Sequence, residues 1–162
     1  MTATRIRTIG PGEGEIAGPA GRTDRFMIDG TDTGGRLSVV EHTLAPHVLA
    51  GPLHRHTRED EYSYVLEGQL AALLGEEEVV AEVGTLVFKP REQWHTFWNP
   101  GDEPTRILEL ICPSGLEDLF RELGTMDEDY DPATLPALAA SYGCELDFEG
   151  TELIMRQHGL VF

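Results

Sequence analysis

The first two thirds of the chain alternate between short runs of apolar, β-branched and aromatic residues and clusters of glycine, proline and acidic residues. Runs of this kind, bounded by turn residues, predict β-strands. Residues 30–35 predict a turn, and Gly75 with Glu76 predicts a hairpin between two runs. The expected strands are 25–29, 37–44, 62–66, 69–74, 78–83, 85–89, 95–98 and 105–112. The pattern therefore predicts an all-β unit of about eight to nine strands.

Beyond residue 113 the pattern changes from strand to helix. Ser114 and Glu117 have the spacing of a capping box, which places Ser114 at the N-cap of a short helix. The apolar pattern continues through Leu123, and Gly124 is expected to end the helix.

A second helix is predicted further along, because Asp131-Pro132 is a typical helix start and Gly143 a typical stop. Between them, apolar residues recur at helical spacing, namely Leu135, Leu138 and Ala139. The tail from Leu153 to Phe162 is apolar enough to pack back on the β-unit. We therefore expect short C-terminal helices.

Length and composition predict how these parts are organised. Residues 1–23 are rich in glycine, proline and threonine, which predicts an arm that could cross to a partner chain. A chain of 162 residues has the size of one domain. We expect an N-terminal arm at 1–23, one β-domain at 24–113 and a C-terminal helical segment at 114–162 that packs on it.

The net charge of the chain limits the kinds of partner that we expect. With 29 acidic residues against 12 Lys and Arg, the net charge is −17, which disfavours nucleic acid and anionic membranes as partners. The sequence offers no run of about 18 apolar residues and no apolar leader segment, so a cytoplasmic location is expected. Cys112 and Cys144 form no CxxC pair, which predicts two reduced thiols.

The candidate chemistry lies between residues 54 and 95. His54 and His56, at i and i+2 on an expected strand, point to the same face about 6.6 Å apart along the chain. Glu61 follows five residues after His56, and His95 arrives from a separate hairpin. Three imidazoles and one carboxylate suit Fe, Zn, Ni, Co or Mn and leave positions open for a substrate.

The spacing of these residues resembles the two motifs of the cupin superfamily. The first motif is glycine, five residues, His-x-His, three or four residues, Glu, six residues, glycine. The second is glycine, five residues, Pro-x-Gly, two residues, His, three residues, Asn. The matching positions are His54, His56, Glu61, Gly68, Gly84, Pro90, His95 and Asn99. Of three neighbouring carboxylates only Glu61, not Glu59 or Asp60, fits the spacing on both sides.

Two glycines of the family pattern are replaced, one by Val48 and the other by Glu92. The loop before His54 and the turn before His95 could therefore differ in shape from those of the family. The resemblance implies a single jelly-roll-like cupin β-barrel of the small, quercetin 2,3-dioxygenase-type kind. It also implies a homodimer.

The resemblance implies one divalent transition metal held by His54, His56, Glu61 and His95, with Fe as the first choice and Zn, Ni, Mn or Co as alternatives. The first expected function is a metal-dependent oxygenase that acts on a small phenolic, enediol or polyketide-like molecule. Glu61 could also be the catalytic base if apolar surroundings raise its pKa. The alternatives are a non-redox cyclase or isomerase of the cupin polyketide-cyclase type, and a non-catalytic small-molecule-binding cupin.

The remaining histidines carry no predicted role. His42, His47 and His158 lie outside both motifs, and isolated histidines in strands and loops are more often structural. Phe97 shares the strand parity of His95 and could line the substrate pocket.

Overall fold

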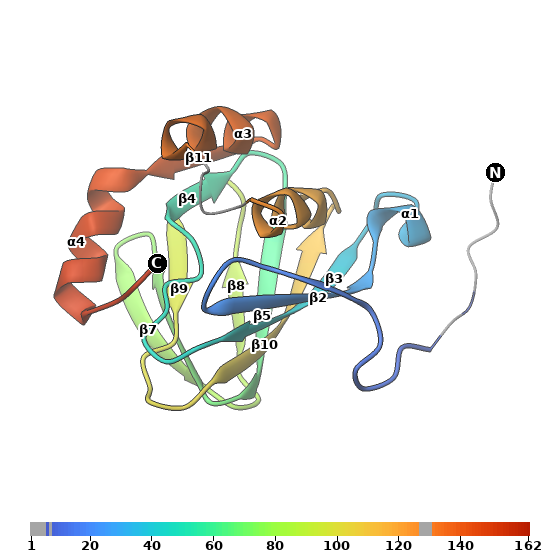
Figure 1. Ribbon diagram of the computed structural model, residues 1–162, viewed down its shortest axis with the longest axis horizontal. Helices are drawn as coiled ribbons and strands as arrows, with labels where there is room; N and C mark the ends of the chain where they lie inside the picture. Colours follow the sequence, from blue (N-terminus) through green and yellow to red (C-terminus); the bar gives the residue numbers. More distant parts are fainter. Residues whose placement is uncertain (1–5, 7, 127–130) are drawn as a thin grey trace.

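Two antiparallel sheets pack face to face in the computed structural model, which describes residues 6, 8–126 and 131–162 (Figure 1). The six-stranded sheet has the order β1-β2-β3-β10-β5-β8, and the five-stranded sheet has the order β11-β4-β9-β6-β7. Helices α2 and α3 lie at one end of the sandwich. The predicted all-β, jelly-roll-like fold with short C-terminal helices is confirmed.

The elements have the following bounds. The six-stranded sheet contains β1 (Glu15–Ala17), β2 (Arg22–Ile28), β3 (Ser38–Leu44), β10 (Thr105–Cys112), β5 (Asp60–Glu67) and β8 (Leu86–Lys89). The five-stranded sheet contains β11 (Cys144–Asp147), β4 (Leu53–His56), β9 (His95–Trp98), β6 (Gln69–Leu74) and β7 (Glu77–Glu82). The helices are α1 (Gly30–Thr33), α2 (Leu116–Gly124), α3 (Leu135–Ser141) and α4 (Phe148–His158), with a 3₁₀ turn at Pro132–Thr134.

The main core lies between the sheets, where the strands turn alternate residues inward. Strand β10 shows the pattern clearly, because Ile107 and Ile111 are fully buried while Leu108 and Leu110 are only half-buried. The buried apolar side chains of this core are Leu44, Ala50, Val65, Leu70, Ala72, Ala81, Val87, Phe97 and Ile107. Burying each large aliphatic side chain contributes about 1.5–3 kcal/mol. The sandwich thus has an apolar interior into which polar groups enter only at particular positions.

Two smaller apolar clusters attach the C-terminal helices. Leu116 and Leu119 of α2 pack against Phe26, Val40 and Ile111 of the six-stranded sheet. On the five-stranded sheet, Ile154 of α4 and Leu160 pack in a cluster that includes Leu49, Leu53, Ala71 and Trp98. None of the described helices is both long and apolar enough to cross a membrane.

Several local predictions were wrong. Residues 15–17 lie in the predicted arm, yet they pair with β2 as strand β1, and β2 itself begins at Arg22. The expected turn at 30–35 contains the short helix α1. Strand β11 was not predicted and pairs with β4. The strands among the described residues therefore number eleven rather than eight or nine.

The start of α2 also differs from its prediction. The N-cap is Gly115, with φ 144°, and not Ser114. Glu117 does not complete a capping box; its carboxylate accepts the backbone N–H of Gly115 at 2.6 Å and that of Gly30 at 2.9 Å. The helix contains Gly124 and ends at the C-cap Thr125. A buried acidic side chain thus connects the helix start to α1.

Candidate metal centre

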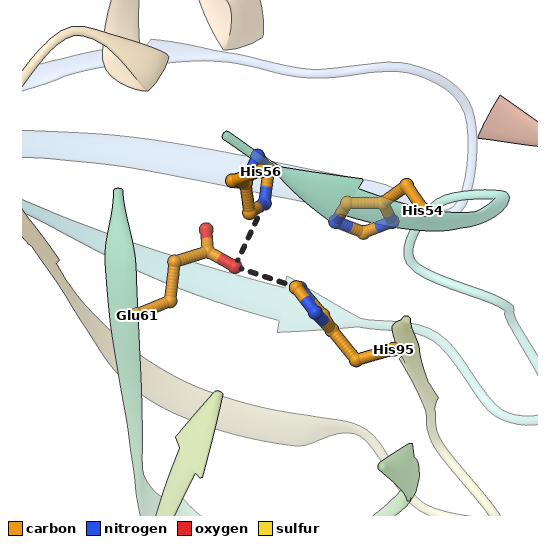
Figure 2. Close-up of side chains that lie close together, drawn as sticks. All are labelled: His54, His56, Glu61 and His95. Carbon is orange, nitrogen blue, oxygen red and sulfur yellow. Dashed lines mark hydrogen bonds and ion pairs between the residues drawn. The ribbon is translucent and has the colours of Figure 1, made fainter. Parts of the chain in front are cut away.

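The four predicted ligands meet at one point inside the sandwich (Figure 2). His54 and His56 come from β4, His95 from β9 and Glu61 from β5 of the facing sheet. The β4–β9 pairing places His54 directly opposite His95, and their ring centroids lie 4.4 Å apart. One nitrogen or oxygen from each of the four residues lies within 4.8 Å of the others. The group could therefore hold one metal ion.

Backbone carbonyls orient two of the imidazoles. His54 Nδ1 lies 2.6 Å from the Pro52 carbonyl oxygen, and His95 Nδ1 lies 3.0 Å from the Gln93 carbonyl oxygen. When Nδ1–H donates to these carbonyls, the lone pair of each ring is on Nε2. Metal-ligating histidines usually have such a partner on the other nitrogen. This arrangement fits a metal site.

Two of the three imidazoles share a single carboxylate oxygen. Nε2 of His56 lies 3.2 Å and Nε2 of His95 lies 3.1 Å from the same Glu61 Oε2. Burial alone would lower the pKa of His56, but the Glu61 carboxylate and, after it, Cys144 raise it to about 10. Burial, together with His95 and His56, holds the pKa of His54 well below its ordinary value. These residues, whose donor atoms converge on one point, match the chemistry that a divalent metal requires.

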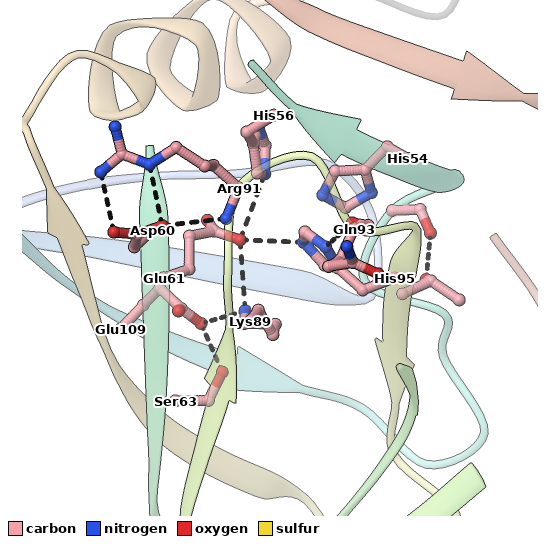
Figure 3. Close-up of polar contacts among 12 residues, drawn as sticks. His54, His56, Asp60, Glu61, Ser63, Lys89, Arg91, Gln93, His95 and Glu109 are labelled. Carbon is pink, nitrogen blue, oxygen red and sulfur yellow. Dashed lines mark hydrogen bonds and ion pairs between the residues drawn. The ribbon is translucent and has the colours of Figure 1, made fainter. Parts of the chain in front are cut away.

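A buried lysine stands beneath the carboxylate (Figure 3). Lys89 Nζ lies 3.3 Å from Glu61 Oε2 and 2.9 Å from Glu109 Oε2, and Ser63 Oγ donates to the same Glu109 oxygen at 2.7 Å. Both Lys89 and Glu109 are buried. The lysine charge offsets the two buried carboxylates, each of which would otherwise be costly to bury.

Lys89 bears on the prediction that Glu61 is a catalytic base. The sequence-based hypothesis required a pKa raised by apolar surroundings. Burial does act in that direction, but Lys89 and His56 hold the pKa of Glu61 well below its ordinary value. That condition is therefore not met in the structure, because the neighbours of Glu61 are cationic rather than apolar. Its role as a base stays a prediction without this support.

Asp60, the carboxylate next to Glu61 in the sequence, lies outside the ligand cluster. Asp60 faces away from the cluster and pairs with Arg91 at 2.8 Å, so the structure places Glu61 and not Asp60 among the imidazoles.

Glu92, which stands where the family has glycine, has φ 65°. Its N–H donates to the His56 carbonyl oxygen at 2.7 Å. The turn thus has a left-handed conformation of the kind that glycine adopts easily.

A cavity of about 340 Å³ opens onto the cluster. His54, His56 and Glu61 line it, and Phe97 lines it as predicted. Most of the remaining lining is apolar and includes Val48, Leu49, Leu119, Phe120, Leu123, Leu135 and Phe162. Cavities of this kind, apolar with a few convergent polar groups, bind small molecules.

Sequence reasoning missed several polar residues of this region, namely Arg22, Asp24, His42, Ser63, Lys89 and Glu109. Arg22 of β2 and His42 of β3 line the cavity, and Asp24 contacts both of them. A signal existed for Lys89, which shares the inward parity of Val87 in an expected strand. Asp24 and His42 gave no such signal, because they meet only through strand pairing.

Comparison with known proteins agrees with the geometry. The family model described as a cupin domain matches residues 40–111. Over 120 residues the chain is 35% identical to the tetracenomycin polyketide synthase protein TcmJ of Streptomyces glaucescens, a match that covers 74% of this chain and 76% of that protein.

Solved structures show the same fold. KdgF from Halomonas sp. has a TM-score of 0.61 at 16% identity, covering 70% of this chain and 99% of that chain. A sugar phosphate isomerase of the cupin superfamily from Silicibacter pomeroyi has a TM-score of 0.57 at 22% identity, covering 65% and 75%. These two likenesses bear on fold alone. The match to TcmJ and the cupin-domain model show that the chain belongs to the cupin superfamily.

Proposed function

We propose that this cupin is a metal-dependent enzyme that acts on a small, polyketide-like carbonyl or phenolic compound. The observation that carries the proposal is the position of His54, His56, Glu61 and His95, which converge beside an apolar cavity of about 340 Å³. The likeness to a polyketide synthase protein supports the substrate class. The ligands of the proposed metal would be these four residues.

The reaction that we favour is a non-redox cyclisation or isomerisation. Joining or rearranging the carbons of a polyketone needs no oxidant, and the similarity to TcmJ therefore moves this alternative ahead of the oxygenase that the sequence alone put first. A bound divalent metal would supply Lewis-acid polarisation of a substrate carbonyl. The Pro52 and Gln93 carbonyls orient the His54 and His95 rings, and Lys89 keeps Glu61 ionised. The apolar walls exclude water from reactive intermediates.

The oxygenase is the second candidate, and the donor set supports it. Three imidazoles and a carboxylate suit Fe, Mn, Co and Ni as well as Zn. The two candidates differ in what they require of the metal. An oxygenase needs a metal with accessible redox or open-shell states, which Zn lacks.

The test is to load the protein separately with Fe, Ni and Zn and to offer flavonols, enediols and aromatic polyketide-like ketones in a sealed oxygen-electrode cell. We expect product with Zn at a rate that is the same without oxygen. Product only with Fe or Ni, at the expense of oxygen, would establish the oxygenase instead. A metal content below about 0.2 per chain after loading would overturn both candidates, because four converging ligands should bind one ion.

We also propose that the protein is a homodimer, with the outer face of β5 and β8 as the contact. Tyr62 and Phe88 stack there with ring centroids 4.8 Å apart, and Tyr64 and Leu86 are exposed beside them. Exposed apolar patches of this kind favour association. Light scattering should give twice the 17.9 kDa chain mass, and Phe88→Glu should give the monomer. A monomeric full-length protein would reject this proposal.

A further inference from the structure

A second polar group borders the same cavity, outside the cupin motifs. His42 of β3 lines the cavity and is 2% exposed. Its Nδ1 lies 2.6 Å from Oδ1 of Asp24, a fully buried residue of β2. The other carboxylate oxygen of Asp24 accepts Nη2 of Arg22 at 2.9 Å. We call His42 and Asp24 the His42–Asp24 pair.

Strand pairing builds this group. Asp24 and His42 are direct partners in the β2–β3 register, so their side chains leave the sheet on the same face. Arg22, two residues before Asp24, shares that face, and its Nη1 donates to the Ala50 carbonyl oxygen. Burial alone would raise the pKa of Asp24, but His42 and Arg22 lower it below its ordinary value. The carboxylate therefore stays ionised and accepts the Nδ1–H of His42.

An imidazole whose Nδ1–H is held by a buried carboxylate has its lone pair on Nε2. Within the described part of the chain, no hydrogen bond to His42 Nε2 is found. The ring stands between Phe97 and Phe120, with centroids at 6.3 Å and 5.3 Å. Phe97 also contacts Lys89, whose Nζ lies 4.3 Å from the ring centroid. An apolar ring thus adjoins both the His42–Asp24 pair and the lysine beside Glu61.

We propose that His42 is a catalytic general acid–base that moves a substrate proton independently of the metal ligands, and that Asp24 is its positioning residue. This inference rests on the proposed function, to which it adds the proton-transfer group. His42 Nε2 takes a proton from the carbon next to a substrate carbonyl, and the electron pair of that C–H bond forms the enolate. The enolate carbon bonds to a second carbonyl carbon, and the resulting alkoxide oxygen takes the proton back from Nε2. No oxidant or further reactant is needed.

The test isolates proton removal from the complete reaction. The zinc-loaded protein is mixed with 1-tetralone, an aryl ketone small enough for the cavity, in D2O, and NMR follows exchange of the protons next to the carbonyl. In His42→Asn, the amide can still donate to Asp24 but no Nε2 lone pair remains. We expect exchange to fall at least about 100-fold, the usual size of a general-base contribution. Zinc content and the dissociation constant for 1-tetralone should not change.

His47→Asn is the matched control. His47 is an exposed histidine whose Nε2 lies 2.9 Å from Asp102, and asparagine tolerates its φ of 58°. This variant should exchange at the wild-type rate. His42→Ala should regain exchange when imidazole is added, which a residue needed only for folding would not do. Asp24→Asn should lower the exchange rate with the dissociation constant for 1-tetralone unchanged.

The outcomes separate this inference from the proposed function. Exchange that survives in His42→Asn, or its absence from the zinc-loaded wild type, overturns the role of His42 and leaves metal binding to be judged by zinc content. Exchange that requires His42 but is unchanged in His95→Ala without bound zinc supports the role of His42 and overturns the metal dependence of the proposed function.

Discussion

Two polar groups border one cavity, and they differ in how their charges are arranged. In the ligand cluster of His54, His56, Glu61 and His95, three imidazoles gather near one carboxylate, and two of them contact the same oxygen. In the His42–Asp24 pair, one imidazole faces one carboxylate oxygen, and Arg22 binds the other oxygen. Several lone pairs directed at one point suit a cation, whereas one lone pair on an imidazole with a fixed tautomer suits a proton. The comparison indicates that one small cavity has a metal-binding arrangement on one wall and a proton-transfer arrangement on another.

The two groups also neutralise their buried carboxylates differently. Glu61 and Glu109 share the ammonium of Lys89, while Asp24 has the guanidinium of Arg22. In both cases the cation is in hydrogen-bonding or ion-pair contact with its carboxylate. Removing one member of a buried pair leaves an uncompensated charge, which costs far more than losing an exposed ion pair.

The largest effect should follow from removing the shared lysine. Lys89→Met keeps the volume of the side chain but leaves the buried Glu109 without its cation and Glu61 with His56 alone, so the free energy of unfolding should fall by about 3–5 kcal/mol. Urea unfolding of the metal-free protein measures this loss. Arg91→Ala, which breaks the exposed pair with Asp60, is the control and should have a much smaller effect. Similar losses in both variants would contradict the argument.

The next effect concerns the ligand cluster itself. Glu61→Ala should weaken zinc binding by more than about 100-fold, because removing a ligand costs at least as much as removing its outer partner. Asp60→Ala should change zinc affinity little, since Asp60 pairs with Arg91 outside the cluster. Competition with a chromogenic chelator gives both affinities. Equal losses would mean that the carboxylate ligand is misassigned.

The sequence predicted the ligand cluster better than it predicted the His42–Asp24 pair, and the reason is geometric. His54, His56, Glu61 and His95 lie in two short segments whose internal spacing determines which side chains share a face. Asp24 and His42 lie on different strands, and they meet only because β2 and β3 pair in one particular register. That register depends on the turn and on a shift of pairing between Phe26 and Ile28. Neither the turn nor the shift of pairing can be inferred from the spacing of residues in the sequence.

Prediction of the strands from the sequence was limited in the same way, because some strands depend on pairing. Long runs such as β10 were predicted with their correct bounds, because eight residues rich in apolar side chains between two turn segments are a strong signal. Strands β1 (EIA) and β11 (CELD) contain only three and four residues, and each forms because a neighbouring strand offers it an edge. Tertiary pairing therefore determined the elements that local pattern could not.

A smaller effect should come from Asp24 through the pH dependence of stability. Its pKa is lower in the folded protein, so it stabilises the fold above its ordinary value of 3.8, and this contribution disappears as pH falls through the folded-state pKa. Asp24→Asn should cost about 1–3 kcal/mol near pH 7, as expected for a buried charged hydrogen bond. The difference from wild type should shrink below pH 3.8. Unfolding curves from pH 3 to 7 measure it, with the exposed Asp102→Asn as control; a difference independent of pH would contradict the assignment.

The smallest effect tests whether the departures from the cupin pattern matter to the ligand cluster. Glu92 has φ 65°, a conformation that glycine adopts without steric cost, so Glu92→Gly should raise the free energy of unfolding by about 0.5–1 kcal/mol. The N–H that it donates to the His56 carbonyl is retained, so zinc affinity should stay the same.

Val48 stands at the other missing glycine, but it is buried and its φ is not positive. Val48→Gly should therefore destabilise the protein, because glycine gains nothing there and the buried side chain is lost. Thermal unfolding of the two variants measures the contrast. Destabilisation by both would mean that the Glu92 side chain makes a contribution that outweighs its backbone strain.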